Sequence, residues 1–195
     1  MTTQLSPDGS TRVAGAGAPT GATSWGSGTK AVLALARVAL GFVFLWAGID
    51  KVLGLGYSTA GEKSWLNGNS PTNGFLSHVS VGPLQSFFHS IAGTWWADWL
   101  FILGLIGIGA ALILGVAMRV AAVAGAVLML MMWIAEFPLD KINSGGEPTG
   151  STNPLVDYHI VYALTALALA AVGAGRAYGL GNLWSRLTKG NKFLQ

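Results

Sequence analysis

Four apolar stretches, each long enough to cross a lipid bilayer, constrain this sequence more than any other feature. They lie at about residues 31–49, 99–118, 120–138 and 155–175. A membrane-spanning helix needs about 20 apolar residues to cover roughly 30 Å of hydrocarbon. Hydrophobic residues make up 52% of the 195 residues and charged residues only 10%, which is far below the charged share of a soluble domain. The sequence therefore predicts an all-α integral membrane protein built as a four-helix bundle.

Charged residues around the stretches separate by sign, and this separation predicts the orientation of the chain. One side of the membrane holds eight of the eleven basic residues: Arg12, Lys30, Arg37, Arg119, Arg176, Arg186, Lys189 and Lys192. The other side holds three lysines and seven of the eight acidic residues: Lys51, Lys63, Lys141, Asp50, Glu62, Asp98, Glu136, Asp140, Glu147 and Asp157. Lys and Arg next to spans stay cytoplasmic, so we expect both termini in the cytoplasm.

The predicted membrane domain covers residues 30–184, and a tail flanks it on each side. Residues 1–29 are rich in Gly, Ala, Ser and Thr and lack the apolar run of a secretory signal, so we expect a disordered cytoplasmic tail. Residues 185–195 form a basic cytoplasmic tail that we expect to lie against anionic lipid headgroups. Between the first two stretches, residues 58–96 form a long segment that we expect to cap the outer face.

Composition excludes several kinds of chemistry. The chain has no cysteine, so by itself it cannot form a disulfide, a thiolate nucleophile, an iron–sulfur cluster or a covalently attached haem. The net charge of +3 comes from basic residues that flank the stretches, without a basic stripe interleaved with aromatics. This pattern does not predict nucleic-acid binding.

The first stretch carries a charge into the membrane however it is placed. About 20 Å of helix separates Arg37 from Asp50, which is less than the hydrocarbon thickness of roughly 30 Å. If the helix begins at Ala31, Arg37 lies inside and either extends to the interface or pairs with a carbonyl at a helix end. If Arg37 marks the interface, the helix runs on to about Tyr57, and Asp50 and Lys51 are embedded.

The outer segment 58–96 holds too many large apolar side chains for a solvated loop. From Pro83 to Trp96 the sequence predicts a short helix that lies in the membrane interface. Apolar side chains repeat there at helical spacing, at Leu84, Phe87, Phe88 and Ile91.

Small residues recur at every fourth position in the last three stretches, and this spacing predicts where helices pack. In lipid, helices associate through close backbone contact, which small side chains allow. The residues are Gly107, Ala111 and Gly115 in the second stretch, Ala117, Ala121 and Gly125 in the third, and Ala166, Ala170 and Ala174 in the fourth. We expect the second and third stretches to form a hairpin that turns at residues 115–119.

The fourth stretch begins with residues that are typical of a helix start. Asn153 is suited to cap the helix, Pro154 fits its first turn, and Asp157 complements the positive end of the helix dipole.

Ionisable residues near the ends of the stretches gather at the outer end of the predicted bundle. Glu136 and His159 are the candidates for handling protons, and Asp50, Lys51 and Asp157 are further catalytic candidates. The alternative is that a carboxylate at a span end only meets water, and Asp157 already has a role at the helix start. Ionisable groups close to spans usually face an interior or a wet cavity. A histidine or a carboxylate there can accept the proton that a quinol releases.

Four aromatic side chains lie close to these polar residues, and we expect them to contact a quinone: Trp133, Phe137, Tyr158 and Tyr162. Aromatic belts at membrane interfaces are common, so aromatic residues alone do not predict a ligand.

A bound metal or haem is not expected. Asp50, Glu136, Asp157 and His159 would offer a hard, oxygen-rich site for Mn or Fe(II). The paired Glu-x-x-His motif of di-iron carboxylate proteins is absent from the sequence. Haem needs a well-placed histidine inside the bundle, whereas two of the three histidines lie in the outer segment.

Several motifs resemble those of a known family. The first stretch carries an Arg and a Gly at 37 and 41, followed by Trp-Ala-Gly-Ile-Asp-Lys at 46–51, and these residues resemble the DoxX-like membrane proteins. Further motifs lie at 64–66, 69–72, 74–76, 153–159 and 179–181. They are similar to the branch of DoxD, the membrane subunit of thiosulfate:quinone oxidoreductase. The resemblance covers about 31–184 and implies four spans, a bacterial plasma membrane and a link to quinones.

The sequence therefore predicts a membrane subunit linked to quinone-dependent redox chemistry within a larger respiratory or oxidoreductase assembly. We expect no tightly bound cofactor beyond a quinone, and we expect other membrane subunits and lipid as partners. A quinol gives up two electrons, and no residue set here holds a redox centre to receive them, so the isolated chain is predicted to be redox-inactive. The first alternative is a non-catalytic accessory subunit. A small-solute transporter is disfavoured because neither an inverted repeat nor a broken span is evident.

Overall fold

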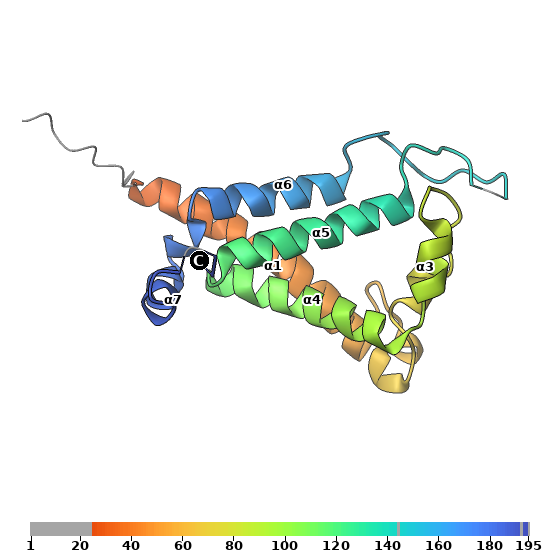
Figure 1. Cartoon of the computed structure of the whole chain (residues 1–195), viewed down its shortest axis with the longest axis horizontal. Coiled ribbons are helices and arrows are strands. Elements are labelled where there is room, and N and C mark those ends of the chain that lie inside the picture. The colour runs from red at the N-terminus through yellow and green to blue at the C-terminus, as the bar shows by residue number, and fades with distance from the viewer. Residues whose placement is uncertain (1–24, 144, 192, 195) are drawn as a thin grey trace, which may run out of the picture.

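The computed structural model describes residues 25–143, 145–191 and 193–194, and its regular elements there are helices, apart from one isolated bridge between Ile142 and Pro148. Four long helices run side by side, and shorter elements lie at both ends (Figure 1). The long helices are α1 (Ser27–Leu53), α4 (Trp95–Leu114), α5 (Met118–Glu136) and α6 (Tyr158–Ala171). The short elements are η1 (Gly61–Lys63), η2 (Trp65–Asn67), α2 (Asn73–Leu76), α3 (Gln85–Ile91), η3 (Ala174–Arg176) and α7 (Gly181–Leu187).

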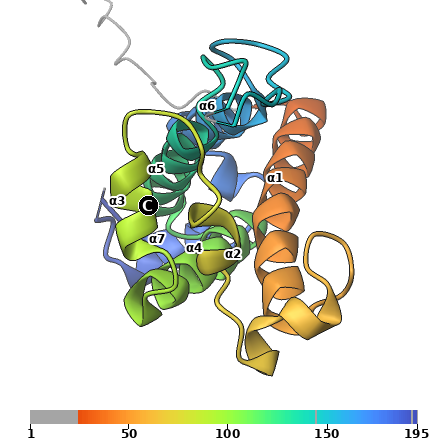
Figure 2. The same ribbon diagram turned by 90° about the vertical axis from the view of Figure 1, so that its right-hand side faces the viewer.

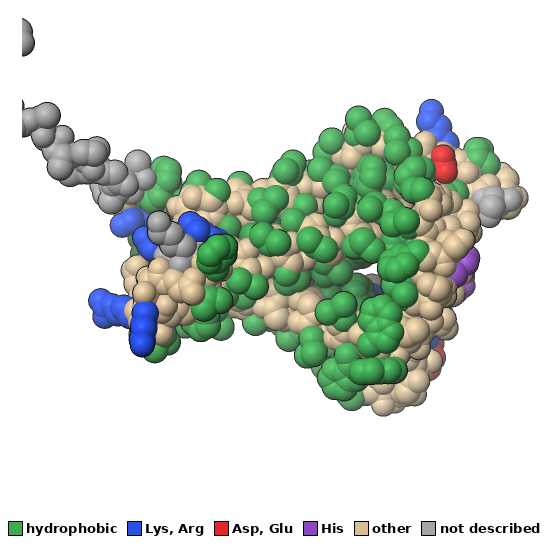
Figure 3. Space-filling view, in the orientation of Figure 1, with side chains coloured by type: hydrophobic (Ala, Val, Ile, Leu, Met, Phe, Trp, Pro, Cys, Tyr) green, Lys and Arg blue, Asp and Glu red, His purple; other side chains and the backbone are tan. Residues whose placement is uncertain are grey.

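The long helices form two pairs. α1 packs mainly on α4, and α5 packs mainly on α6, while α4 and α5 join the pairs through their short turn. The pairs diverge toward the end that the outer segment caps, where α2 and α3 lie (Figures 1 and 2). Hydrophobic side chains cover the middle of the visible face, and basic side chains cluster at the end that carries α7 (Figure 3). An apolar belt between charged ends is what a bilayer requires of a membrane bundle.

Three of the described helices, α1, α4 and α5, are long and apolar enough to cross a membrane. With 20 and 19 residues, α4 and α5 each cover about 30 Å at 1.5 Å per residue. α6 has 14 residues and covers about 21 Å, so its helical part is shorter than the predicted range 155–175. Helix α6 begins three residues later and ends four residues earlier than predicted, because Asp157 caps its start and Gly173, with a φ of 69°, follows its end.

Helix α1 extends beyond the predicted range 31–49 at both ends, and it stops four residues before Tyr57, the end given by the alternative placement. It begins at Ser27, so it includes the last residues of the predicted tail, and it ends at Leu53 with Gly54 in the left-handed conformation. Asp50 and Lys51 therefore lie within the helix rather than after it. The rest of the amino-terminal tail, residues 1–24, lies outside the described residues, as do 192 and 195 of the basic tail.

The predicted interface helix 83–96 is wrong in its extent. Helix α3 covers only Gln85–Ile91, the chain turns at Gly93 with a φ of 74°, and Trp95 already begins α4. Of the four apolar side chains in the predicted repeat, Phe88 is buried, whereas Leu84 and Phe87 are exposed. The ring of Phe87 is therefore exposed, as aromatic side chains at a membrane interface are.

Asp98, in the first turn of α4, anchors the outer segment to the bundle. Its buried carboxylate accepts hydrogen bonds from Ser70 Oγ at 2.8 Å, Thr72 N at 2.9 Å and Thr72 Oγ1 at 2.6 Å. Charge-assisted bonds of this kind are stronger than neutral ones. The outer segment is therefore held to α4 at a fixed point rather than lying loosely over the bundle.

Close packing between α1 and α4 depends on Gly109 rather than on the predicted Gly107. A Cβ at Gly109 would lie 2.5 Å from Leu45 N, whereas a Cβ at Gly107 would meet nothing within 4 Å. The predicted small residues of α5 and α6 do face the interior, since Ala121 and Ala166 are buried. Of the three predicted α4 residues, only Gly107 is without a close neighbour, since Ala111 packs against the core and a Cβ at Gly115 would lie 2.5 Å from Arg37 Nη1.

Arg37 joins three parts of the bundle from a fully buried position. Its Nη1 donates to Leu112 O at 2.7 Å and Ile113 O at 2.8 Å, and its Nη2 donates to Ala177 O at 3.4 Å. Leu112 and Ile113 lie in the last turn of α4, where carbonyls have no partner within the helix. Of the two sequence hypotheses for Arg37, pairing with carbonyls at a helix end is therefore confirmed.

Candidate functional site

Asp157 starts α6 and holds the first polar side chain of the candidate site. Its Oδ1 accepts from the backbone of His159 at 3.0 Å and Ile160 at 3.2 Å, so Asp157 is the N-cap. The predicted cap was Asn153. Its Oδ1 instead accepts hydrogen bonds from the backbone N–H groups of Leu155 and Val156, in the turn before the helix. The predicted place of Pro154 in the first helical turn is likewise wrong, because it precedes the cap.

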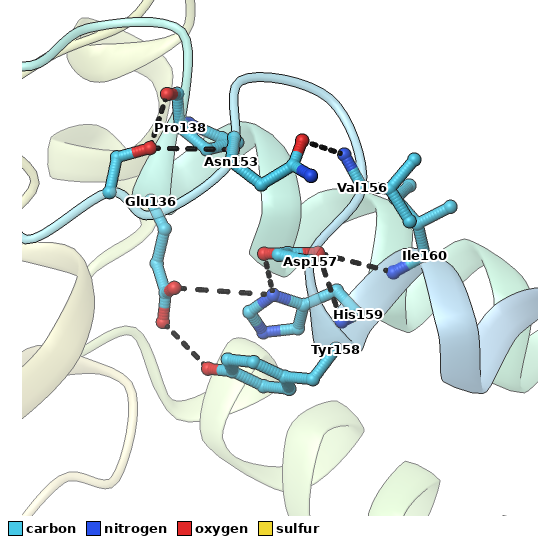
Figure 4. Close-up of polar contacts among 9 residues, drawn as sticks. Glu136, Pro138, Asn153, Val156, Asp157, Tyr158, His159 and Ile160 are labelled. Atoms are coloured by element: carbon cyan, nitrogen blue, oxygen red, sulfur yellow. Dashed lines mark hydrogen bonds and ion pairs between the residues drawn. The ribbon is translucent and has the colours of Figure 1, made fainter.

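His159 is fully buried, and Asp157 fixes its orientation. The Nδ1 atom of His159 lies 2.8 Å from Asp157 Oδ2 and 4.0 Å from Glu136 Oε2 (Figure 4). When Nδ1 carries the ring proton it donates to Asp157, and Nε2 then bears a lone pair. Nε2 is buried without a hydrogen-bond partner among the described residues. An orphaned buried polar atom is costly, and it marks a place where a ligand or a water would bind.

Glu136 ends α5 and faces the start of α6. Its Oε1 accepts from Tyr158 Oη at 3.1 Å, and its side chain is 39% exposed (Figure 4). Glu136, Asp157 and Tyr158 line a cavity of about 430 Å³, together with Phe75 and His78 of the outer segment. The carboxylate of Glu136 therefore links the buried imidazole to a cavity at the outer end.

The four predicted aromatic residues lie around this cluster. Tyr158 lies against His159 with ring centroids 4.0 Å apart, and Tyr162 packs on Tyr158 at 5.9 Å. The rings of Trp133 on α5 and of Phe137, the residue after α5, have centroids 6.4 Å apart. Trp133 Nε1 is a buried donor without a partner in the described part of the chain, as are Arg37 Nε and Ser64 Oγ outside this cluster.

Asp50 and Lys51 are separate from this cluster. Asp50 is buried at the end of α1, where it accepts from Tyr57 N at 3.3 Å, Ser58 N at 2.9 Å and Ser58 Oγ at 2.8 Å. Lys51 Nζ lies 5.9 Å from the Phe101 ring centroid and lines a different cavity of about 580 Å³. All five ionisable residues therefore lie at one end of the bundle, as predicted, but these two form a group of their own. Both lie at the outer end of the bundle, but on the α1–α4 pair.

The remaining three residues could hold a metal ion by their geometry. Each residue offers one ligand atom, and these three atoms, from Glu136, Asp157 and His159, all lie within 4.8 Å of one another. A cation at Nδ1 of His159 would have to replace the hydrogen bond to Asp157. The predicted oxygen-rich set with Asp50 is not assembled, and the absence of a metal stays a prediction.

Sequence reasoning did not identify the anchoring role of Asp98. A signal was present, since Ser70 and Thr72 offer two hydroxyl groups two residues apart beside Pro71. Such residues favour turns and local hydrogen bonds. Nothing in the pattern shows that the turn meets the first turn of α4.

The fold and the site define a helical-bundle membrane protein with a buried histidine and two carboxylates under its outer segment. The chain matches the DoxX family over residues 32–136, more than half of its length, and it belongs to that family. The match is to the family as a whole, and the narrower resemblance to DoxD stays a prediction. Glu136 is the last matched residue, so Asp157 and His159 lie beyond the match. Searches of curated proteins and of solved structures each found no match.

Proposed function

We propose that this chain is a membrane subunit of a larger respiratory or oxidoreductase assembly and that it binds a quinone between the outer ends of α5 and α6. His159 carries the proposal. Its imidazole is 0% exposed, Asp157 holds its Nδ1 at 2.8 Å, and its Nε2 has no partner among the described residues. An oriented imidazole with one unpaired nitrogen is suited to exchange a proton with a ligand hydroxyl.

A second buried polar atom supports a ligand between these helices. Trp133 Nε1 lies one turn before Glu136 on α5, and it too is unpartnered in the described part of the chain. A Trp N–H can only donate, whereas a neutral imidazole nitrogen without a proton accepts. A quinone carbonyl would satisfy the donor, and a quinol hydroxyl would satisfy the acceptor. Tyr158, Tyr162 and Phe137 supply ring surface beside them.

Oxidation of a quinol to a quinone releases two protons and two electrons. In this proposal His159 Nε2 takes one proton and the carboxylate of Glu136 takes the other. Glu136 is 39% exposed and lines the outer cavity, so it can pass its proton to water there. The electrons go to a redox centre in a partner subunit, because the protein environment supplies orientation and proton transfer rather than electron storage.

The proposed location is the bacterial plasma membrane, with both termini in the cytoplasm. The sorting of charge supports this orientation, since basic side chains gather at the α7 end (Figure 3). Lys and Arg on short segments near spans stay cytoplasmic. The outer cavity then faces away from the cytoplasm, and the protons of a quinol would leave on that side.

Labelling with a photoreactive quinone analogue tests the proposal on the purified full chain. We expect labelled peptides from the outer ends of α5 and α6, and His159→Ala should reduce the labelling by about 10-fold. His89→Ala is the matched control, because it removes an exposed imidazole of α3 whose described hydrogen bond goes to Val79 O and not to Glu136, Asp157 or His159. Equal labelling of wild type and both variants would contradict quinone binding here.

Purification in mild detergent separates the enzyme-linked role from the accessory role. Co-purified quinone supports the proposal, whereas stoichiometric larger subunits without quinone support a non-catalytic accessory subunit. Turnover of a quinol analogue with a soluble electron acceptor should be absent for the isolated chain. Robust turnover by the isolated, cofactor-free chain would contradict its dependence on partners.

A further inference from the structure

An apolar cavity of about 170 Å³ lies where the two helix pairs diverge, beneath the outer segment. α4 contributes Ala97 and Leu100 to its wall, α5 contributes Met131 and Met132, and α2 contributes Phe75. The space-filling view shows an opening in this region, between α4 and α5 beside α3 (Figure 3). Protein interiors are close-packed and leave few voids larger than a water molecule. A space of this size therefore favours an occupant.

The wall of this cavity is suited to hydrocarbon. No ionisable side chain is among the described residues that line it, and their one hydroxyl group, on Thr72, already donates to Asp98. A buried water needs about three hydrogen-bond partners, so the cavity offers little to water. The flexible thioether side chains of Met131 and Met132 can adapt to the shape of an apolar chain.

The size and the position of the cavity both indicate that only part of a ligand binds there. Pockets for whole small molecules measure roughly 300–1,000 Å³, which the outer cavity of about 430 Å³ reaches and the apolar cavity does not. Trp96 and Leu100 line the apolar cavity and are exposed on the surface of α4. The cavity therefore reaches the lipid-facing side of the bundle, and a chain that enters it can continue into the bilayer.

The apolar cavity and the outer cavity adjoin. Phe75 lines both of them. On α5, Met131 and Met132 line the apolar cavity, and Ala135 and Glu136, about one turn later, line the outer cavity. A ligand whose head lies in the outer cavity can therefore place an apolar chain in the other one.

The charge of the outer cavity selects among the heads that carry apolar chains. Glu136 and Asp157 line it, and no lysine or arginine is among its described lining residues. A phospholipid brings a negatively charged phosphate, which two carboxylates repel. A quinone head is neutral, so it is the head that this cavity favours.

We propose that the apolar cavity binds the isoprenoid tail of a quinone whose head lies between the outer ends of α5 and α6. The inference rests on the proposed function and adds the class of quinone, which is a membrane-resident quinone with an isoprenoid tail rather than a soluble one without it. Ala97 and Leu100 limit the width of the cavity from the side of α4, so their size decides whether a tail fits.

Competition for photolabelling of the purified full chain tests this inference. The label is a photoreactive quinone without a tail, and the competitors are menadione, which has no tail, and a menaquinone with two isoprene units on the same head. Ala97→Leu extends a buried side chain into the cavity, and we expect it to raise the concentration of tailed competitor needed for half-inhibition by about 10-fold. The concentration of menadione needed should change by less than about twofold. Each competitor is compared between proteins, so its partition into detergent cancels.

A second variant makes the test independent of how Ala97→Leu folds. Leu100→Trp enlarges another side chain of the cavity wall, and Leu103→Trp is its matched control. Both leucines are exposed on α4 about one turn apart, but of the two only Leu100 lines the cavity. We expect weaker competition by the tailed quinone in Leu100→Trp and competition like that of the wild type in Leu103→Trp.

The outcomes separate this inference from the proposed function. Absence of labelling at the outer ends of α5 and α6 in the wild type would overturn both. Normal labelling, with the tailed competitor unaffected by Ala97→Leu and by Leu100→Trp, would overturn the tail site and leave the head site in place. Equal weakening of both competitors would also overturn the tail site. A phospholipid that native mass spectrometry finds on the wild type but not on Ala97→Leu, with quinone competition unchanged, would assign the cavity to an acyl chain instead.

Discussion

Arg37 and His159 are both fully buried, yet the two regions use their polar atoms in opposite ways. Arg37 donates to carbonyls 75, 76 and 140 residues away in the sequence, and it joins α1 to the end of α4 and to the chain after η3. Among the described residues, the His159 ring makes its one hydrogen bond to Asp157, two residues before it, and the same ring nitrogen lies 4.0 Å from Glu136. A buried polar group with many distant partners holds the fold together, whereas one with a single local partner has binding capacity left for a ligand. The predictions below test this difference.

Removal of the Arg37 side chain should have the largest effect. Arg37→Met deletes three hydrogen bonds from a charged donor, and we expect a loss on the order of 3 kcal/mol in the free energy of unfolding. His159→Gln removes one local bond, and it should cost about 1 kcal/mol. Titration with SDS, followed by circular dichroism, measures both. Equal losses would show that the two buried groups do not differ in role.

Substitution at the α1–α4 contact should have the next largest effect. Gly109→Ala places a methyl group 2.5 Å from Leu45 N, which is backbone and cannot rotate away, so we expect a loss of about 2 kcal/mol. Gly107→Ala is the matched control on the same helix, because a Cβ there meets nothing within 4 Å. The same SDS titration compares them. If Gly107→Ala destabilised as much as Gly109→Ala, the packed face of α4 would be the one that spacing predicted.

Asp157 allows helix capping to be separated from the orientation of His159. Asp157→Ala removes the N-cap of α6 and should cost about 1 kcal/mol. Asp157→Asn keeps a good capping residue, so its stability should stay close to that of the wild type. Both variants remove the carboxylate that holds His159 Nδ1, so both should reduce labelling by the quinone analogue. Full labelling of Asp157→Asn would show that a charged partner is not needed.

The smallest effect is expected at the exposed edge of the site. Tyr158→Phe removes the hydrogen bond to Glu136 but keeps the ring against His159, and we expect a loss of about 0.5 kcal/mol. Thermal unfolding of both proteins in detergent measures the difference in stability between the wild type and the variant. A loss above about 2 kcal/mol would mean that this pair holds α5 to α6, and the site would then be structural.

Positions along the membrane normal could be predicted from the sequence, but positions around the bundle could not. Hydropathy located the long helices, and charge placed Glu136, His159 and Asp50 at one end. Asp50 nevertheless lies on α1 and bonds its own following loop, while Glu136 and His159 meet across α5 and α6. Hydropathy and charge give depth, whereas the rotation and pairing of helices depend on side-chain packing. The same limit included Gly107 among the packing residues of α4 and left out Gly109.

Local ends of helices were predicted less well, because several residues compete for the same role. Asn153 and Asp157 are both good caps, and only the structure shows that Asp157 caps the helix while Asn153 closes the preceding turn. Helix α3 was predicted too long because Gly93 interrupts an apolar run that otherwise keeps helical spacing. The pairing of Arg37 with helix-end carbonyls was one of two hypotheses, and its depth alone did not decide between them.

The bonds of Arg37 also set an order of events during biosynthesis. α1 leaves the ribosome first, and its guanidinium has to wait for carbonyls that are synthesised 75 residues later in α4 and 140 residues later after η3. An arginine held in hydrocarbon without partners is costly, so α1 is poorly settled in the bilayer until α4 arrives. We therefore expect the first helix to reach its final position only when α4 has been inserted, and its last bond to form when the carboxyl-terminal segment emerges.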